Sequence, residues 1–472
     1  MKPTQHLKRR QPPQIGKVGS LNVWMNGELV GEWTTLRTGT PLFRYTTTWS
    51  QSPRARALSL SMPITADLEV RGTVVDNYFD NLLPENPAIR RRIRERFGTR
   101  STQAFDLLEA IGRDCVGAVQ LLPIHQEPID WNRVEATRLN DGDMERLLQA
   151  VPSSPPLGHD HDDDFRISIA GAQEKTALLS MGNVWYRPHG ATPTTHILKL
   201  PLGIVGNFRR DLSDSVENEW LCAQLMREFG LPIADADILT YGKQTVLSVK
   251  RFDRRWIGAA AADVLRSQFQ PKAGQWIARL PQEDFCQATG RPPTEKYEAD
   301  GGPTSEEILE ILEGSESRDS DRAHFVLAQL AFWLLAATDG HAKNFSIFHR
   351  VGGAFGMTPM YDVLSAWPVI GAGANQLPIQ DAKLAMAIRG KSRHYRLREI
   401  HPRHWHELAL RIGIPGLWGR MRNLVESTDA HVAMVRARLP SSFPERVIDA
   451  IAAGVKQQAQ TFTATAPPAS AE

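Results

Sequence analysis

The segment from Ala336 to His349, AATDGHAKNFSIFH, constrains this 472-residue chain more than any other feature. A long apolar stretch precedes it and the strand-like FSIF lies near its end, so a short polar loop stands between two segments that favour burial. Buried polar groups cost free energy unless they are hydrogen-bonded or have a function. We therefore expect a helix, a loop and a strand in which the loop forms part of a functional site.

The spacing inside this loop indicates phosphoryl transfer. Asp339 and Asn344 have the D-x-x-x-x-N spacing of the protein-kinase catalytic loop, in which the aspartate accepts or orients a hydroxyl proton and the asparagine amide oxygen holds a metal. Asp362 follows in PMYDVLSAWP and is predicted to be a second Mg²⁺ ligand. The D-F-G tripeptide of ordinary kinases is absent, and an aspartate in such a place can also cap a turn.

Phosphate binding is expected upstream, from a loop and a lysine. The loop offers small residues where backbone N–H groups can approach phosphate oxygens, although its spacing matches neither a Walker A motif nor G-x-G-x-x-G. The loop consists of Ala170, Gly171, Ala172, Gln173, Glu174 and Lys175. Lys199 stands among apolar strand residues in HILKLP, where a lysine either extends to solvent or meets an anion. These features follow one another in the order found in a kinase. The order is a glycine-containing loop, a lysine on a strand, an acid on a helix, the catalytic loop and an acidic metal ligand.

Shifts in composition divide the chain into six parts. We expect a disordered tail at 1–20, an N-terminal α/β domain without chemistry of its own at 21–150, a linker at 151–165, a nucleotide-binding lobe at 166–255, a mostly helical catalytic lobe at 256–455 and a second disordered tail at 456–472. Asn26-Gly27 within an alternating pattern predicts a β-hairpin. The pattern over 214–232 predicts a helix that Asp214 caps, with Glu217 three residues later.

Charge, cysteine content and hydropathy exclude several classes of protein. The 55 basic and 53 acidic residues give a net charge of +2, which neither favours nor excludes a nucleic-acid partner. Three scattered cysteines, Cys115, Cys222 and Cys286, argue against a disulfide framework or a thiolate zinc site. The most apolar stretch, 325–337, is shorter than the about 20 residues that cross a bilayer. We expect a cytoplasmic protein with no membrane partner.

Several segments together resemble the HipA family of toxin serine/threonine kinases. They include RISIAGAQEKTALL, PTTHILKLP, VKRFDRRW, KYEADGGP, ATDGHAKNFSIF and PMYDVLSAWP, while WMNGELVGEW and NYFDNLLPENP resemble the amino-terminal domain of that family. The resemblance runs from about residue 21 to residue 450. It implies an α+β, HipA-like kinase fold with an N-terminal α/β domain and a mostly helical C-terminal kinase lobe.

The resemblance also implies roles for single residues. It makes Asp339 the catalytic base, Asn344 and Asp362 the metal ligands, and Ser168 a site of autophosphorylation. A phosphoserine there carries about −1.5 to −2 charge beside the phosphate loop, which would silence the kinase. The ATP contacts that it implies, besides the loop 170–175, are Lys199, Lys250, Arg251, Phe252, His341, Ala342, Lys343, Asn344, Tyr361 and Asp362.

The activity that the resemblance implies is transfer of the ATP γ-phosphate, with Mg²⁺, to a protein hydroxyl. The substrate of the family is glutamyl-tRNA synthetase, whose phosphorylation halts translation and arrests growth. The partners of the family are a HipB-like helix-turn-helix antitoxin and, through the toxin–antitoxin complex, operator DNA. Two alternatives stay open: a catalytically idle co-repressor that binds antitoxin and DNA, and a kinase of small molecules.

Three features depart from the family pattern or lie outside it. Lys250 stands where the pattern V-E-R-F-D-R has an acid, which affects nucleotide preference only if the side chain contacts adenine. His401, His404 and His406 surround Trp405, but Pro402 interrupts the spacing of a helical metal site. A basic run lies where some relatives approach DNA, although a solvated charged face is the simpler explanation. This run contains Arg389, Lys391, Arg393, Arg396 and Arg398.

Overall fold

The Asn26-Gly27 pair forms the hairpin that the sequence predicts. In this computed structural model, which describes residues 17–36, 38–152, 170–171, 173–206, 209–266 and 269–467, both turn residues have positive φ, 47° and 83°. The hairpin is the centre of an antiparallel sheet with the order β4-β3-β2-β1-β5. The elements of this domain are β1 (Lys17–Met25), β2 (Glu28–Leu36), β3 (Pro41–Tyr45), β4 (Glu69–Arg71), β5 (Val119–Pro123), α1 (Thr47–Ser50), α2 (Thr73–Asp80), α3 (Pro87–Phe97) and α4 (Ala104–Ile111).

A second sheet, with the order β12-β13-β9-β7-β8-β6, forms the lobe that the sequence predicts over 166–255. Its strands are β6 (Ala136–Arg138), β7 (Lys175–Met181), β8 (Val184–Pro188), β9 (His196–Lys199), β12 (Ala236–Tyr241) and β13 (Gln244–Lys250). Beside it lie α5 (Asp141–Ala150), α6 (Ser215–Glu228), α7 (Ala261–Val264) and the strand pairs β10 (Gly203–Val205) with β11 (Arg210–Leu212) and β14 (Arg254–Ile257) with β15 (Trp276–Arg279).

The boundary expected at residue 150 is wrong. β6 pairs with β8, and Met144 and Leu148 of α5 are buried in one cluster with Leu178, Leu198 and Val246 of the second sheet. Residues 136–150 therefore pack on the second sheet rather than on the N-terminal one, because their apolar face is complementary to it. Most of the expected linker, together with Ser168 and Ala172, lies outside the described residues.

The third part is mostly helical, and α10 forms its centre. Its elements are α8 (Phe285–Ala288), α9 (Ser305–Leu312), α10 (Arg318–Leu335), α11 (Pro402–Ile412), α12 (Leu417–Glu426), α13 (Thr428–Arg436), α14 (Glu445–Thr465), β16 (Gln282–Asp284), β17 (Ser346–His349), β18 (Phe355–Met357), β19 (Lys383–Arg389) and β20 (Arg393–Arg396). Every residue from Phe325 to Leu335 is buried, as expected of a core helix. Among the described residues, no helix is both long and apolar enough to cross a membrane.

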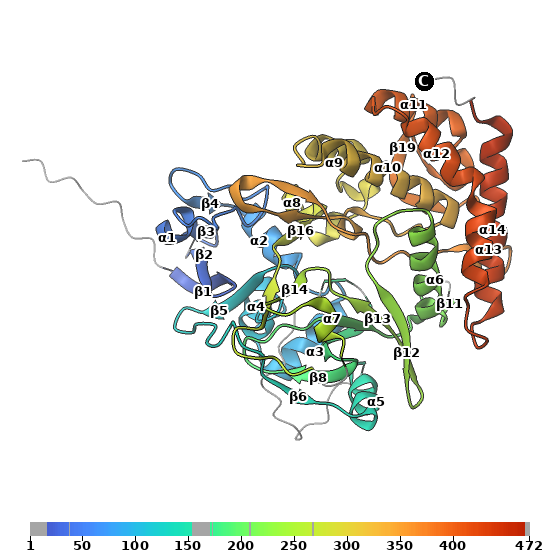
Figure 1. Cartoon of the computed structure of the whole chain (residues 1–472). Helices are drawn as coiled ribbons and strands as arrows, with labels where there is room; N and C mark the ends of the chain where they lie inside the picture. The colour runs from blue at the N-terminus through green and yellow to red at the C-terminus, as the bar shows by residue number, and fades with distance from the viewer. Residues whose placement is uncertain are drawn as a thin grey trace, which may run out of the picture.

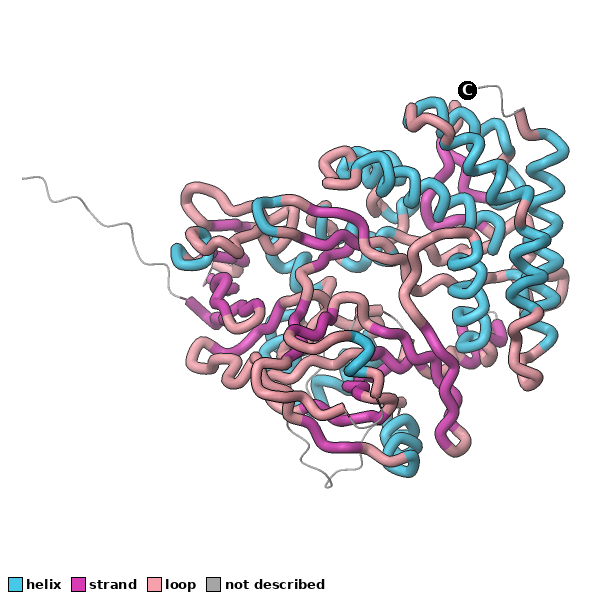
Figure 2. Tube along the Cα trace, in the orientation of Figure 1, coloured by secondary structure: helices cyan, strands magenta, loops and turns pink. Residues whose placement is uncertain are grey.

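Strands predominate at the left and bottom of the molecule, and helices at the upper right (Figure 2). α6 lies between them, because it contacts β12 and β13 on one side and α13 and α14 on the other (Figure 1). The predicted helix at 214–232 is thus α6, with Gly230 (φ 74°) just beyond its end. Asp214 makes no side-chain cap hydrogen bond and pairs instead with Arg446 at 2.5 Å, so the predicted cap is wrong.

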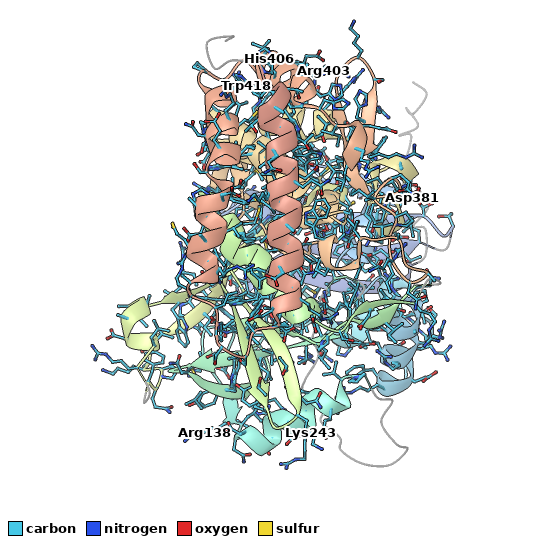
Figure 3. All side chains as sticks on the ribbon, turned by 90° about the vertical axis from the view of Figure 1, so that its right-hand side faces the viewer. Arg138, Lys243, Asp381, Arg403, His406 and Trp418 are labelled. Carbon is cyan, nitrogen blue, oxygen red and sulfur yellow. The ribbon has the colours of Figure 1, made fainter. Side chains whose placement is uncertain are left out.

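The disordered tail expected at 456–472 is wrong for residues 456–465, because α14 continues to Thr465, and 468–472 lie outside the described residues. Its apolar residues at helical spacing, among them Ala459 and Phe462, are buried against α10 and α12. The ring of Phe462 lies 6.3 Å from that of Trp333 and 5.6 Å from that of Trp418. In Figure 3, α14 runs along the face of the molecule, with Trp418 near its upper end.

Phe462→Ala tests this correction. Truncating a buried aromatic side chain costs about 3–5 kcal/mol, so the free energy of unfolding should fall by at least about 3 kcal/mol in a urea titration. Thr461→Ala, an exposed neighbour on the same helix, is the control and should stay within about 0.5 kcal/mol of the unmodified chain. Equal stability of the two variants would show that the C-terminal segment does not pack.

Candidate active site

The loop after α10 presents Asp339 at the mouth of a pocket. Ala336 ends the helix in the left-handed region (φ 49°), and a Cβ on Gly340 would approach the Phe332 ring to 2.3 Å, so only glycine fits there. The backbone carbonyl of Asp339 accepts the N–H of His341 at 2.8 Å. Its carboxylate is 60% exposed, within the pocket wall formed by both lobes. Partial desolvation raises the pKa of Asp339, while a hydrogen bond from Tyr297 acts in the opposite direction.

Asn344 and Asp362 meet in the same pocket. Asn344 lies in the 3₁₀ turn η3 (Ala342–Asn344), and its Nδ2 donates to the backbone carbonyl of Asp362 at 3.0 Å. Asp362 has φ 62°, a left-handed conformation that is costly for a residue other than glycine and is typical of functional sites. Among the described residues, neither Oδ1 of Asn344 nor Oδ2 of Asp362 has a hydrogen-bond partner. One amide and one carboxylate oxygen fit a Mg²⁺ site, which also takes phosphate oxygens and water.

Lys199 joins three segments of the chain. Its ammonium lies 2.6 Å from Glu219 on α6 and 2.6 Å from Asp362. Burial alone would lower the pKa of Lys199, but the two carboxylates outweigh it and hold that pKa above its usual value. Burial likewise raises the pKa of Glu219 to about 7, whereas Lys199 and Lys175 outweigh burial at Asp362 and hold its pKa well below the usual range. Lys199 and Asp362 are therefore both charged at neutral pH.

Lys175 lies directly across from Lys199 in the sheet. No hydrogen bond or ion pair joins its ammonium to the described residues, and Gly171 (φ 113°) lies so close that a Cβ there would be 2.5 Å from Nζ. Burial lowers the pKa of Lys175 to about 8, and the charge of Lys199 acts in the same direction. A cation that has no direct ion pair with the described residues and lies beside a glycine in the pocket wall is suited to bind an anion.

The remaining phosphate-loop residues divide between the pocket and the N-terminal domain. Ala170 and Gln173 line the pocket, and Nε2 of Gln173 donates to the Leu200 carbonyl at 2.5 Å. Glu174 does not line it, because its carboxylate pairs with Arg92 of α3. The carbonyl of Gly171 accepts the N–H of Glu85 at 3.1 Å. The N-terminal domain thus fixes the loop from outside.

The exit of β13 forms another wall of the pocket, where Lys250, Arg251 and Phe252 lie. Lys250 is exposed, and its N–H donates to the Asp235 carbonyl at 2.8 Å. The buried guanidinium of Arg251 binds Asp253 at 2.8 Å and Asp114 at 3.3 Å. Its guanidinium is therefore bound to the N-terminal domain, and only the backbone and the aliphatic part of Arg251 can face a ligand.

Lys343 and Tyr361 stabilise the loop over 339–344, which the sequence predicts to be catalytic. The buried Nζ of Lys343 donates to Oδ1 of Asn81 and Oδ2 of Asp284, both at 2.7 Å, and to the Asn81 carbonyl at 3.2 Å. With these partners its ammonium is saturated, although Lys343 also lines the pocket, and its expected ATP contact stays a prediction. The Tyr361 hydroxyl donates to the Lys343 carbonyl at 2.8 Å. Ala342, another expected contact, does not line the pocket.

Three residues near the site were missed in the sequence. Glu219 is two positions after the glutamate that the capping pattern singled out, and only the sheet register shows which helix face meets Lys199. Tyr297, in the KYEADGGP segment, donates from its hydroxyl to Oδ1 of Asp339. Asn81 lies in the N-terminal domain, which we expected to have no part in the chemistry. Its hydrogen bonds with Lys343 show that this domain does contribute to the site.

The basic run forms the hairpin of β19 and β20, in which Arg389 and Arg393 are a cross-strand pair. Both are exposed and contact acids, Arg389 with Glu306 at 3.9 Å and Arg393 with Glu298 at 3.4 Å. Lys391, at the turn, is exposed and has no hydrogen bond or ion pair with the described residues. The face is thus solvated and basic.

The histidines around Trp405 lie at the N-terminus of α11. His401 precedes α11, and its N–H donates to Nδ1 of His404 at 3.2 Å. The ring of His404 stacks on that of His394, 4.0 Å away. Within the described ranges, no group of three metal-ligating side chains is formed.

Comparison with known proteins identifies relatives over most of the chain. The family model of the HipA N-terminal domain matches residues 21–122, and that of the HipA-like C-terminal domain matches residues 167–439. Y4mE of Sinorhizobium fredii, named as a kinase, is 32% identical over 88% of this chain and 91% of its own length. The serine/threonine-protein kinase toxin HipA of Shewanella oneidensis is 27% identical over 86% of this chain and 83% of its own.

A solved structure shares the fold. The Shewanella oneidensis toxin–antitoxin complex of HipA, HipB and operator DNA contains a chain that matches 94% of this one and 97% of its own length, with a TM-score of 0.74 and 21% identity. The expected α+β, HipA-like fold is therefore confirmed.

The pKa of Lys175 predicts a pH dependence of nucleotide affinity. Lys175 is charged below about pH 8 and neutral above it, so its attraction for phosphate is present at neutral pH and lost as the pH rises. We expect the affinity for ATP to fall about tenfold between pH 7 and pH 9 in a calorimetric titration. This factor corresponds to the free energy that one hydrogen bond from a charged group contributes to binding. Lys175→Met should abolish this dependence, and Lys243→Met, at an exposed turn, should retain it. An identical pH profile in Lys175→Met would contradict the assignment.

Lys343→Met separates a structural lysine from a phosphate-binding one. Its loss leaves the Asp284 carboxylate buried without a counter-charge, so the free energy of unfolding should fall by about 3–5 kcal/mol in urea. The folded fraction should bind ATP within about twofold of the unmodified affinity. Lys391→Met, on the exposed hairpin, is the control. Unchanged stability combined with weaker ATP binding would restore the role that the sequence suggested.

Proposed function

The chain belongs to the HipA family, and from this premise we propose that it is an ATP-dependent serine/threonine protein kinase whose active site is the pocket around Asp339. One observation carries the proposal: Asp339, Asn344, Asp362 and Lys199 come from three separate segments and line one pocket. Their types and order match the requirements of phosphoryl transfer, in which catalysis is mainly positioning and charge stabilisation.

In the proposed reaction, the acceptor hydroxyl lies against Asp339 at the pocket mouth. The hydroxyl oxygen forms a bond to the γ-phosphorus of ATP, the bond from that phosphorus to the β–γ bridging oxygen breaks, and ADP leaves. The hydroxyl proton passes to the Asp339 carboxylate, whose raised pKa suits a general base. Lys175 and Lys199 attract and orient the phosphates. The pocket walls at Lys250 and Phe252 enclose the adenine ring of ATP.

Magnesium is the divalent ion that this family implies, and Asn344 and Asp362 would hold it. When bound, it neutralises charge on the transferring phosphates. The uncommitted oxygens of the two side chains support this assignment, since hard cations take oxygen ligands.

We propose further that the protein is a growth-arresting toxin with the partners of its family. The acceptor would be a protein serine, with glutamyl-tRNA synthetase as the first candidate, and Ser168 would be phosphorylated by the kinase itself. A HipB-like antitoxin would neutralise it and bind operator DNA with it. The exposed pair Arg389 and Arg393, together with Lys391, which has no ion pair with the described residues, supports a DNA contact through the β19–β20 hairpin.

Asp339→Asn tests the proposed activity. Loss of the general base should lower the rate of phosphate transfer about 100- to 10,000-fold and relieve growth arrest, while the protein stays folded. The measurement is mass spectrometry of phosphoserine in this chain and in a cell extract after incubation with ATP. Asp381→Asn, on the molecular surface (Figure 3), is the matched control and should behave as the unmodified chain.

The two alternatives give different results in that assay. An unmodified chain that phosphorylates no protein and turns over no ATP would support an idle co-repressor. ATP turnover with a small molecule and without a protein acceptor would support a small-molecule kinase. Full activity of Asp339→Asn would remove this residue from the mechanism.

A further inference from the structure

We propose that Lys296, Tyr297 and Glu298 form a positioning element that holds Asp339 in its working orientation. Three consecutive side chains contact three different parts of the molecule: the N-terminal domain, the catalytic loop and the β19–β20 hairpin. The inference rests on the proposed function, because it gives Tyr297 a role through the proposed base. Tyr297 is a positioning residue rather than a catalytic one, since it acts through Asp339.

Tyr297 is the central member of this element. Its hydroxyl donates the only hydrogen bond that the Asp339 carboxylate receives from the described residues. The other polar group nearby, Nε2 of His341, lies 3.9 Å away, beyond hydrogen-bond distance. The rings of Tyr297 and His341 pack edge to face at 5.2 Å, which fixes the direction of the hydroxyl. Without it, a carboxylate that is 60% exposed would turn freely about its side-chain bonds.

Lys296 attaches the element to the N-terminal domain and to the loop. Its ammonium lies 2.6 Å from Oε2 of Glu85, and both side chains are about five-sixths buried, at 16% and 15% exposure. Its backbone carbonyl accepts the N–H of Ala342 at 3.3 Å. The segment before Tyr297 is therefore bound both to the α2–α3 connection and to the catalytic loop that carries Asp339.

Glu298 attaches the other end, and its side chain is 1% exposed. Oε2 accepts the N–H of Ala387 in β19 at 2.7 Å, and Oε1 lies 3.4 Å from Nε of Arg393. The turn that follows requires glycine, because a Cβ on Gly302 would approach the Tyr297 carbonyl oxygen to 2.7 Å. Fixed on both sides, Tyr297 cannot shift without breaking buried polar contacts, so its hydroxyl gives Asp339 a constant partner.

The expected consequence is a specific kinetic defect. Misplacing a catalytic group by about 1 Å can cost about 100-fold in rate. The lysines proposed to bind ATP lie on strands β7 and β9, and Tyr297 is not among the residues that line their pocket, so nucleotide affinity should be preserved. Loss of the Tyr297 hydroxyl should therefore lower kcat about 10- to 100-fold and leave the KM for ATP within about twofold.

The experiment compares Tyr297→Phe with the unmodified full-length chain. Phosphate transfer gives kcat and KM, and hydrogen exchange of peptides covering 337–346 reports the order of the catalytic loop without requiring activity. Tyr297→Phe should show the kinetic defect and severalfold faster exchange in that peptide. Lys296→Met removes the ion pair with Glu85, and it should lower kcat and speed hydrogen exchange less than Tyr297→Phe does. Tyr186→Phe, whose hydroxyl in β8 makes no hydrogen bond with the described residues, is the matched control and should show neither.

Each outcome separates the inference from the function on which it rests. Unmodified kcat and unmodified exchange in Tyr297→Phe would overturn the positioning role. If the unmodified chain transfers no phosphate, or Asp339→Asn remains fully active, the proposed function fails, and loop exchange alone then decides whether Tyr297 orders the loop. If Tyr297→Phe does not fold, the same two readouts in Lys296→Met decide.

Discussion

The ion pairs of Lys199 with Glu219 and Asp362 are the interaction on which the rest of the site depends. They bring together β9, a central strand of the second sheet, the helix α6 and the loop after β18. A buried charge without a partner is costly, so each of these segments stabilises the position of the other two. The same pairs orient Asp362, whose backbone carbonyl in turn fixes the amide of Asn344.

The N-terminal domain is part of this site rather than an appendage. Asn81 binds Lys343 in the catalytic loop, Glu85 binds Lys296, and Arg92 binds Glu174 beside the phosphate loop. Asp114 joins the exit of β13 through Arg251. Three of these contacts bind charges for which the sequence suggested an ATP contact, those of Lys343, Glu174 and Arg251. The candidate site is therefore not confined to one domain, because residues of the N-terminal domain bind its charged side chains.

Periodic local patterns in the sequence were good guides to the fold. The Asn26-Gly27 hairpin, α6 and the buried α10 follow from alternation, helical spacing and apolar content, which are properties of neighbouring residues. The tail expected at 456–472 was wrong because a polar, threonine-rich segment can still present Phe462 to a core. The boundary at 150 was wrong because β6 and α5 pack on strands that follow much later in the chain.

The sequence by itself determined the types and order of the groups proposed to act in the reaction: an aspartate and an asparagine at kinase spacing, a later aspartate and an earlier strand lysine. It did so because two of them leave one short loop and the others stand out among apolar neighbours. Only the tertiary structure decided which charges remain available. Lys343 is bound by Asp284 and Arg251 by Asp114, both far away in the chain, whereas Lys175 has no such partner among the described residues. Tyr297 donates to Asp339, 42 residues later in the chain. Such pairings depend on distances in space, which residue spacing does not contain.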